Sequence, residues 1–332
     1  MKPNTAKIVL GIESTAHTLG IGIVKNGRII ANEKSMLFEY GIHPRKTADH
    51  HADAFQEVME AALKKAGIKL KDIDLIAFSQ GPGIGPCLRI SSIAARTFAI
   101  SFNKPVVGVN HCVAHIEISK HFTGFKDPLV LYVSGGNTQI LIKKENRYHV
   151  LGETLDVGIG NMLDTFARSA GLKNAKDVEE KALNGKKYIP MPYSVKGMDA
   201  SFSGILTHSE KLIGKEKIED ICYSLQETSY AALCEITERA LALIEKKEIT
   251  ICGGVAQNKR LQKMLSDMAE EWNCKFGVAP NEFNADNGGM IAYVGYLISK
   301  LDEKNQRKYL LSPNKILPKP KFRTDEFLIK WQ

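Results

Sequence analysis

The sequence lacks any paired-cysteine motif. Its six cysteines stand singly, and none lies at C-x-x-C spacing, which excludes a zinc ribbon and a thioredoxin-type redox centre. Several lie in apolar runs, such as Cys252 in Ile-Thr-Ile-Cys-Gly, which is typical of buried free thiols in a reducing compartment. No apolar stretch is long enough for a signal peptide near the start, and none approaches the roughly 20 residues of a membrane span. We therefore expect a cytoplasmic protein without membrane association.

The sequence also lacks the general base of a zinc peptidase. His111-Cys-Val-Ala-His115 carries two histidines four positions apart, which share one face of a helix and are spaced to bind one metal ion. In the peptidase motif a Glu follows the first His, whereas Cys112 stands here. A metalloprotease is therefore disfavoured, and a simple surface pair of histidines is the competing interpretation.

Positively charged residues are in slight excess over negatively charged ones. Lys plus Arg number 45 and Asp plus Glu 37 among 332 residues, so the formal charge is +8. Hydrophobic residues make up 44% and charged residues 25%, a composition typical of soluble globular proteins of one large domain or two lobes. The basic excess is compatible with a polyanionic partner, and a noncatalytic nucleic-acid-binding scaffold is one alternative.

The chain repeats one plan of predicted elements. An apolar strand, a polar turn and a hairpin open each copy, at residues 7–31 and again at 129–151. Alternating helices and strands follow both hairpins. The expected helices are 51–66, 88–102, 217–246, 258–272 and 286–302, and the expected strands are 75–79, 106–109, 249–252 and 275–278. This order predicts mixed sheets with helices on their faces.

Two such copies predict an actin-like ATPase fold, a duplicated α/β architecture whose two lobes enclose a nucleotide cleft. Lobe I is expected over 1–117 and lobe II over 128–302, with the border in the polar segment 117–128. The carboxyl-terminal segment 303–332 is expected to pack back on lobe I. Two ordinary α/β layers without a shared site are the alternative.

Glycine-rich and hydroxyl-rich turns follow the first strand of each copy. Glu13, Ser14 and Thr15 form the first turn and Gly135-Gly-Asn-Thr138 the second, where small residues let backbone N–H groups approach phosphates. A third turn, Cys252-Gly-Gly-Val-Ala-Gln-Asn258, resembles a nucleoside-binding turn. Gly254 and Asn258 are placed to contact a ribose or base, and Asn258 as a helix N-cap is the alternative.

Tyr132 and Asp286 are further candidate metal ligands. Tyr132 ends the strand before the second turn, and Asp286 precedes a predicted helix, where a capping role is the alternative. Two histidines and an aspartate, with or without a phenolate, suit iron or zinc.

The sequence resembles the universal threonylcarbamoyladenosine transferases of tRNA, in the form that belongs to the archaeal and eukaryotic KEOPS complex. Tyr132 is typical of that form. The resemblance runs nearly end to end. It is carried by GIESTAHT (11–18), GIHPR (41–45), GPGIGPCLRI (81–90), VNHCVAHIE (109–117), LYVSGGNTQ (131–139), DVGIGNMLDTFAR (156–168), YIPMPYSVKGMDASFSGI (188–205), GGVAQNKRL (253–261) and ADNGGMIA (285–292).

The resemblance implies particular site residues. His111, His115, Tyr132 and Asp286 would hold one iron or zinc ion per subunit. ATP or threonylcarbamoyl-AMP would be bound by Tyr132, Val133, Ser134, Gly135, Gly136, Asp164 and Asn258. The sequence departs from the family at 172–180, where a Pro/Gly-rich segment is shortened and its glycines are missing. Glu179 matches the family's nearby acid only by counting back from Gly185.

The resemblance also implies the reaction. A threonylcarbamoyl group would pass from threonylcarbamoyl-AMP to the exocyclic amine of the adenosine next to the anticodon, in tRNAs reading ANN codons. No protein nucleophile is required beyond the metal centre. Expected partners are tRNA and KEOPS subunits, including an atypical small kinase, fused in some archaea, and small helper proteins. An actin-like ATPase or a small-molecule kinase is the alternative, because a fold alone does not determine chemistry.

Overall fold

The computed structural model describes residues 7–37 and 43–331, and the chain divides into two compact units. Unit 1 comprises Met1–Ile118, Glu145–Arg147 and Asp286–Gln332, and unit 2 comprises Ser119–Lys144 and Tyr148–Ala285. Residues 1–6, where we expect no signal peptide, lie outside the described residues, as do residues 41 and 42 of the GIHPR motif. Among the described residues, no helix combines the length and apolarity needed to cross a membrane.

Unit 1 is built on a five-stranded mixed sheet with the order β3-β2-β1-β4-β5. Its strands are β1 (Ile8–Glu13), β2 (Thr18–Lys25), β3 (Arg28–Met36), β4 (Leu75–Gly81) and β5 (Val106–Asn110). β1, β2 and β3 pair antiparallel, whereas β1, β4 and β5 pair in parallel. Asn26 and Gly27, both at positive φ, make the hairpin turn that the Asn-Gly pair predicts.

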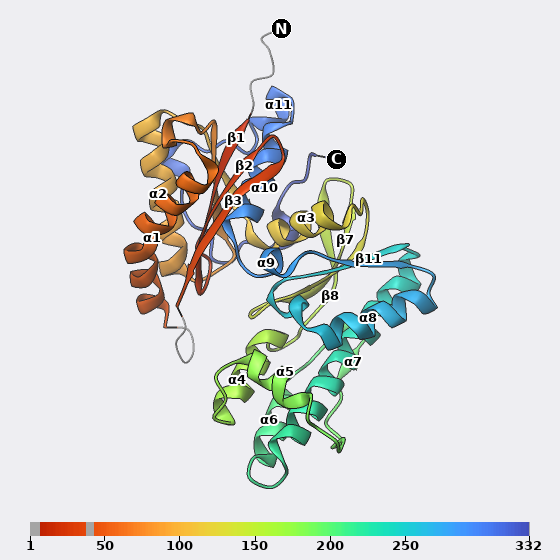
Figure 1. The fold of residues 1–332 in the computed structure, drawn as a ribbon. Helices are drawn as coiled ribbons and strands as arrows, with labels where there is room; N and C mark the ends of the chain where they lie inside the picture. Colours follow the sequence, from red (N-terminus) through yellow and green to blue (C-terminus); the bar gives the residue numbers. More distant parts are fainter. Residues whose placement is uncertain (1–6, 38–42, 332) are drawn as a thin grey trace. The chain divides into compact units, whose positions relative to one another are not determined.

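Helices cover both faces of this sheet (Figure 1). The helices of unit 1 are α1 (Pro44–Ala66), α2 (Gly85–Phe102), the first part of α3 (His111–Thr123), α10 (Gly288–Ser299) and α11 (Glu303–Gln306), with 3-10 turns at Leu70–Asp72, Pro313–Lys315 and Thr324–Glu326. Leu10 and Ile12 point into a core with α1 and α2. Their neighbour Gly11 faces α10, and a Cβ there would lie 2.3 Å from the backbone nitrogen of Ala292. The backbones of β1 and α10 therefore touch.

The close packing of α10 corrects one expected boundary. We expected 286–302 to end lobe II, but the structure assigns Asp286–Gln332 to unit 1. Gly20 and Gly22 on β2 lie against Gly288 so closely that a Cβ on either would fall within 2.6 Å of its backbone. The carboxyl-terminal segment also packs on unit 1, where Gln80 Nε2 donates a hydrogen bond to the carbonyl of Leu317 at 3.0 Å.

Unit 2 repeats the same strand order. Its sheet runs β12-β11-β6-β7-β8 and is formed by β6 (Leu129–Val133), β7 (Thr138–Lys144), β8 (Arg147–Glu153), β11 (Glu248–Cys252) and β12 (Lys275–Val278). As in unit 1, the opening strand pairs antiparallel with the next strand of its hairpin and parallel with a later strand. The duplicated order is that of the actin-like ATPase fold, so the fold class expected from the sequence is confirmed.

The helices of unit 2 bury one face of its sheet. They are α4 (Ile159–Ser169), α5 (Ala175–Ala182), α6 (Ser203–Leu212), α7 (Ile218–Ile244), α8 (Lys259–Glu271) and α9 (Asn281–Asn284), with a 3-10 turn at Gly254–Gln257 and a small hairpin of β9 (Val195–Lys196) and β10 (Asp199–Ala200). Leu131, Val133 and Ile251 from the strands pack with Phe166 and Leu233 from these helices. In the shortened segment, Asn174 caps α5 by accepting hydrogen bonds from Lys176 N and Asp177 N.

Candidate functional site

The two histidines open α3 directly after strand β5. Asn110 caps this helix, because its Oδ1 accepts a hydrogen bond from Val113 N at 3.1 Å. Its Nδ2 donates to the carbonyls of Phe322 and Arg323, which ties the start of the helix to the carboxyl-terminal segment. The rings of His111 and His115 lie one helical turn apart, with centroids 4.7 Å apart and planes at 87°. Both side chains are buried, so the alternative of a surface pair is wrong.

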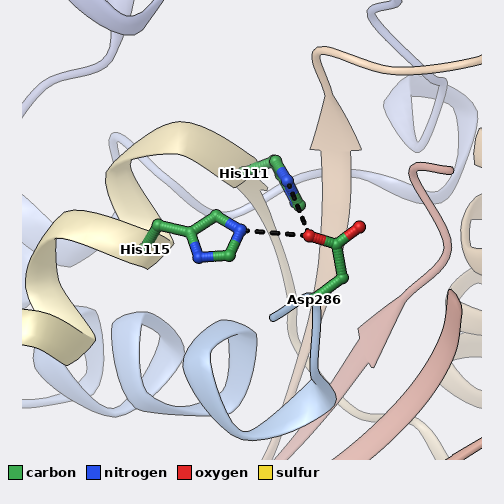
Figure 2. Close-up of side chains that lie close together, drawn as sticks. All are labelled: His111, His115 and Asp286. Atoms are coloured by element: carbon green, nitrogen blue, oxygen red, sulfur yellow. Dashed lines mark hydrogen bonds and ion pairs between the residues drawn. The ribbon is translucent and has the colours of Figure 1, made fainter. Parts of the chain in front are cut away.

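Asp286 faces both histidines (Figure 2). Its Oδ1 lies 3.1 Å from Nε2 of His115 and 3.5 Å from Nε2 of His111. The cap of α10 is the next residue, Asn287, whose side chain accepts a hydrogen bond from Met290 N. Asp286 is therefore free of the capping role that was its alternative, and its carboxylate is directed at the imidazoles.

These three side chains form a candidate ligand set on chemical grounds. One ligand atom from each of His111, His115 and Asp286 lies within 4.8 Å of the others. Two imidazole nitrogens and a carboxylate oxygen are the donors that iron(II) and zinc accept, and three protein donors leave positions for a substrate oxygen. The residues present thus fit a catalytic-type metal site, all within unit 1.

Glu13 takes a role that the sequence did not predict. At the end of β1 its Oε2 lies 3.0 Å from Nδ1 of His111, and its Oε1 accepts a hydrogen bond from Thr15 N at 2.6 Å. Thr15 Oγ1 lies 3.2 Å from the same imidazole nitrogen. Ser14 Oγ donates to the carbonyl of Cys87. The side chains of the expected first phosphate turn are therefore engaged inside unit 1, where two of them hold His111.

The charges of the cluster depend on one another. Burial acts to lower the pKa of His111, but the carboxylates of Glu13 and Asp286 raise it to about 9. Burial lowers the pKa of His115 and outweighs its hydrogen bond to Asp286. Burial also acts to raise the pKa of Asp286, but the imidazoles bring it below its ordinary range. Without a metal, a protonated His111 lies between two carboxylates, so a cation that binds here replaces a proton.

The second glycine turn lies at the end of β6 in unit 2. Ser134 N donates to the carbonyl of Asn137 at 2.8 Å and closes the turn. Gly135 packs against the amino-terminal end of α4, where a Cβ on Gly158 would lie 2.5 Å from the Gly135 carbonyl oxygen. Gly136 is exposed, and a Cβ there would meet no atom within 4 Å. The turn therefore presents open backbone at Gly136 beside the amino terminus of α4, where the helix dipole favours anions.

The first helical residues of α4 complete this arrangement. Gly160 N and Asn161 N donate to the carbonyls of Ser134 and Gly135 at 3.1 and 3.0 Å. A Cβ on Gly160 would lie 2.8 Å from the Cα of Gly135. The role of Gly158 and Gly160 was not predicted, although the spacing of two glycines just before an apolar helix was a visible signal for close packing.

Tyr132 and the third turn lie close to the second turn, because the two turns follow the neighbouring strands β6 and β11. Tyr132 on β6 is buried and pairs in parallel with Cys252 on β11. Gly253 follows at φ +98, where a Cβ would lie 2.2 Å from the Val133 carbonyl oxygen and 3.1 Å from the Tyr132 ring. Gly254 is exposed, with nothing within 4 Å of a Cβ. Within unit 2, open glycine backbone thus follows both central strands.

The polar side chains expected to bind a nucleotide serve mainly local structure. Asn258 is buried and caps α8 through Leu261 N, while its Nδ2 donates to Gln226 Oε1 at 3.1 Å. Asp164 accepts a hydrogen bond from Ala175 N at 2.8 Å, at the start of α5. Glu179 is half-buried and accepts from Lys259 N at 3.3 Å. The capping alternative for Asn258 is therefore what the structure contains.

Known proteins resemble this chain over nearly its whole length. The model of the TsaD family, described as tRNA N6-adenosine threonylcarbamoyltransferase, matches residues 26–293. A protein of that name from Thermococcus sibiricus is 52% identical over 98% of this chain and 100% of its own length. The protein of that name from Archaeoglobus fulgidus is 46% identical over 98% and 99%. A "probable bifunctional tRNA threonylcarbamoyladenosine biosynthesis protein" of Methanocaldococcus jannaschii is 47% identical, and the match covers 98% of this chain and 60% of that protein.

Solved structures resemble the chain in fold. HypF of T. kodakarensis superposes with a TM-score of 0.64 at 16% identity, covering 91% of this chain and 49% of HypF. Component A of (R)-2-hydroxyglutaryl-CoA dehydratase from Acidaminococcus fermentans reaches 0.54 at 15% identity, covering 88% and 97%. Such distant likeness bears on the fold alone. Because the family model spans most of the sequence and archaeal relatives match it from end to end, the chain belongs to the family of tRNA N6-adenosine threonylcarbamoyltransferases.

Proposed function

We propose that this chain transfers the threonylcarbamoyl group of threonylcarbamoyl-AMP to the exocyclic amine of the adenosine next to the anticodon, in tRNAs that read ANN codons. Family membership supports the class of reaction. The observation that carries the proposal is the cluster of the buried His111 and His115 with the half-buried Asp286, which fits one iron or zinc ion. We further propose that the protein acts in the cytoplasm.

The reaction is an acyl transfer. The amine nitrogen attacks the carbonyl carbon of the mixed anhydride, the bond to the phosphate oxygen breaks, AMP leaves, and the amine loses a proton. This amine is a weak nucleophile because its lone pair is delocalised into the ring. Positioning and stabilisation of developing negative charge must therefore supply most of the acceleration. When bound, the metal would supply Lewis-acid polarisation of a ligand oxygen.

Different residues of the chain are suited to hold the metal and to position the adenylate. Glu13 accepts the Nδ1 proton of His111 and so holds the other ring nitrogen toward Asp286, as carboxylates commonly do behind metal-binding histidines. In unit 2, the backbone of Ser134, Gly135 and Gly136 is suited to the adenylate phosphate, and the exposed backbone of Gly254 to the nucleoside. Glu179 as a further contact to the ligand remains a prediction from the resemblance. Tyr132 as a fourth metal ligand remains a prediction from the resemblance.

The proposed partners follow from the relatives. Several bifunctional relatives extend well beyond the matched region, which covers 56% to 61% of those proteins. Their names, which call them bifunctional, support a fused partner in the same pathway. We propose that this chain works in a KEOPS-type assembly with an atypical small kinase, fused or separate, and small helper subunits.

The test is reconstitution with donor synthase, ATP, threonine, bicarbonate and tRNA, followed by nucleoside analysis. We expect the modified adenosine with the parent chain and its loss in His111→Ala. His121→Ala is the matched control, because His121 is exposed in the last turn of the same helix. ADP release without modified nucleoside would overturn the proposal in favour of an ATPase or kinase. Normal transfer by His111→Ala would remove the metal cluster from the reaction.

A further inference from the structure

An extended segment of unit 2 is fixed along helix α7 by a polar stripe. Asp220, Ser224 and Thr228 recur every four residues on α7 and so share one face. Asp220 Oδ1 accepts hydrogen bonds from Lys186 N and Lys187 N at 2.7 and 2.9 Å, and Ser224 Oγ accepts from Ile189 N at 2.8 Å. This stripe holds the backbone of residues 186–189 in a single register on the helix.

Gly185 brings the segment close to the helix. A Cβ at this position would lie 2.3 Å from the Cβ of Tyr223. One residue after Lys187, the hydroxyl of Tyr188 forms a hydrogen bond with Thr228 Oγ1 at 2.9 Å. Tyr188 is therefore held by its own hydroxyl and by the backbone hydrogen bonds of its two neighbours, Lys187 and Ile189, although half of its surface is exposed.

Three tyrosines line an open pocket at this place. The pocket has a volume of about 280 Å³ and is bounded by Tyr188, Tyr193, Tyr223, Glu227, Thr228, Ala231 and Met264. Tyr188 and Tyr193 are 50% and 48% exposed. The hydroxyl of Tyr193 donates to the Glu235 carboxylate, so it too has a hydrogen-bond partner. Because both hydroxyls are bonded to protein, what these two side chains offer to a ligand is mainly aromatic ring.

The acids at the pocket are neutralised by arginines. Glu227 receives two hydrogen bonds from Arg260, at 2.7 and 2.6 Å. Glu235 pairs with Arg239, one turn farther along α7. Guanidinium planes and aromatic faces are the two protein surfaces on which unpaired bases stack. Because the polar groups at the pocket bond to one another, few remain to read the edge of a base.

We propose that this tyrosine pocket binds an unstacked base of the tRNA substrate by stacking and with little sequence preference. The inference rests on the proposed function, since it takes its ligand from the tRNA on which the enzyme acts. A planar π ligand matches the exposed ring faces, and the volume of the pocket accommodates a nucleobase. The exposed Lys186 and Lys196 lie two and three positions from the two tyrosines in the sequence and supply positive charge for the adjoining phosphates.

The test measures tRNA affinity of the full chain, in its assembly, without the transfer reaction. Tyr193→Ala should weaken binding about tenfold, the scale of one lost base–aromatic stack. Tyr193→Phe keeps the ring and should bind within about twofold of the parent. The dependence of affinity on salt should be the same in all three proteins, because no charge is removed. In addition, an unstructured oligonucleotide should quench the tryptophan fluorescence of Tyr193→Trp.

The outcomes separate this inference from the proposed function. Equal tRNA affinity of Tyr193→Ala and the parent, or no quenching of Tyr193→Trp, overturns the pocket. So does a Tyr193→Ala variant that keeps its tRNA affinity but loses a protein subunit, since the pocket then binds protein. Loss of affinity in Tyr193→Phe as large as in Tyr193→Ala also overturns it, because the hydroxyl would matter rather than the ring. A parent that binds tRNA but transfers nothing counts against the proposed function and leaves the stacking result standing.

Discussion

The Nδ1 atom of His111 donates a hydrogen bond to Oε2 of Glu13 over 3.0 Å, which turns the other ring nitrogen toward Asp286. Strand β1 thereby fixes the orientation of a side chain that begins a helix almost a hundred positions later. The carboxylate lies in the core, where a negative charge persists only with partners such as this imidazole and Thr15 N. Glu13 is thus best understood as the residue that positions His111, a proposed metal ligand.

Replacing Glu13 by Gln tests that role. The amide keeps the size of the side chain but removes the charge that favours an Nδ1 proton on His111. We expect metal affinity to fall by about 10–100-fold, as for other carboxylates behind metal-binding histidines. Competition with a chelator measures the change. Glu33→Gln is the control, because Glu33 pairs with Lys65 at the surface of the same sheet. Equal metal affinity of Glu13→Gln and the parent would contradict the assignment.

Gly136→Ala isolates the proposed phosphate contact. The new methyl group would meet no protein atom within 4 Å, so thermal stability should be unchanged. A bound adenylate phosphate would be pushed away, and AMP affinity should fall on the order of tenfold, the scale of forcing a methyl group into a packed contact. Gly204→Ala, whose Cβ would only touch Pro192 at 3.9 Å, serves as control for both calorimetric titration and melting. AMP binding that survives in Gly136→Ala places the phosphate elsewhere.

Substitution of Asn258 separates capping from ligand binding. Asn258→Ala removes the cap of α8, and the free energy of unfolding should drop by about 0.5–2 kcal/mol in urea denaturation. Asn258→Ser retains a capping oxygen and should recover most of that loss. Because the amide is already bonded to Gln226 and Leu261 N, both variants should bind AMP as the parent does. If Asn258→Ser folds stably but binds AMP weakly, the ribose or base contact expected from the sequence is right.

The pH dependence of stability should reveal how much the ionised Asp156 side chain stabilises the fold. Burial acts to raise its pKa, but hydrogen bonds from Ser203 and from the backbone of Val157 and Phe202 lower it from 3.8 to about 2. A folded-state pKa below the unfolded value stabilises the protein above about pH 4, and this contribution disappears as the pH falls toward 2. Urea midpoints of the parent should therefore fall more steeply over this window than those of Asp156→Asn. Parallel curves for the two proteins would show that Asp156 contributes nothing.

The sequence predicts the fold better than it predicts the roles of single side chains. The apolar strands and the long helices α7 and α8 appear within a few residues of their expected bounds, because each is set by local periodicity. The short helices α4, α5 and α6 were not predicted, since their positions depend on packing within unit 2 rather than on length. The assignment of α10 to unit 1 depends on glycine contacts with a strand more than 250 positions away, which no local pattern encodes.

In the site, too, local patterns could be predicted from the sequence and tertiary contacts could not. His111 and His115 are detectable because a helix places residues four apart on one face. Asp286 was detectable only as an acid near a helix start, and the choice between cap and ligand required knowing that Asn287 caps α10. Glu13 and Asn258 were assigned to ligands because their true partners, His111 and Gln226, are distant in sequence. Turn chemistry is local, whereas the partner of a buried polar group is decided by tertiary structure.

The discontinuity of unit 1 has a consequence for the newborn chain. Glu13 and the two histidines are synthesised before almost all of unit 2, but Asp286 and the helix that closes the other face of their sheet follow only after all of unit 2 has been made. A nascent chain that stops short of residue 286 carries two imidazoles without the carboxylate that joins them. The complete set of three donors therefore arises late, when most of the polypeptide is already present. Binding of the proposed metal ion by all three residues can therefore begin only after the chain has returned to unit 1.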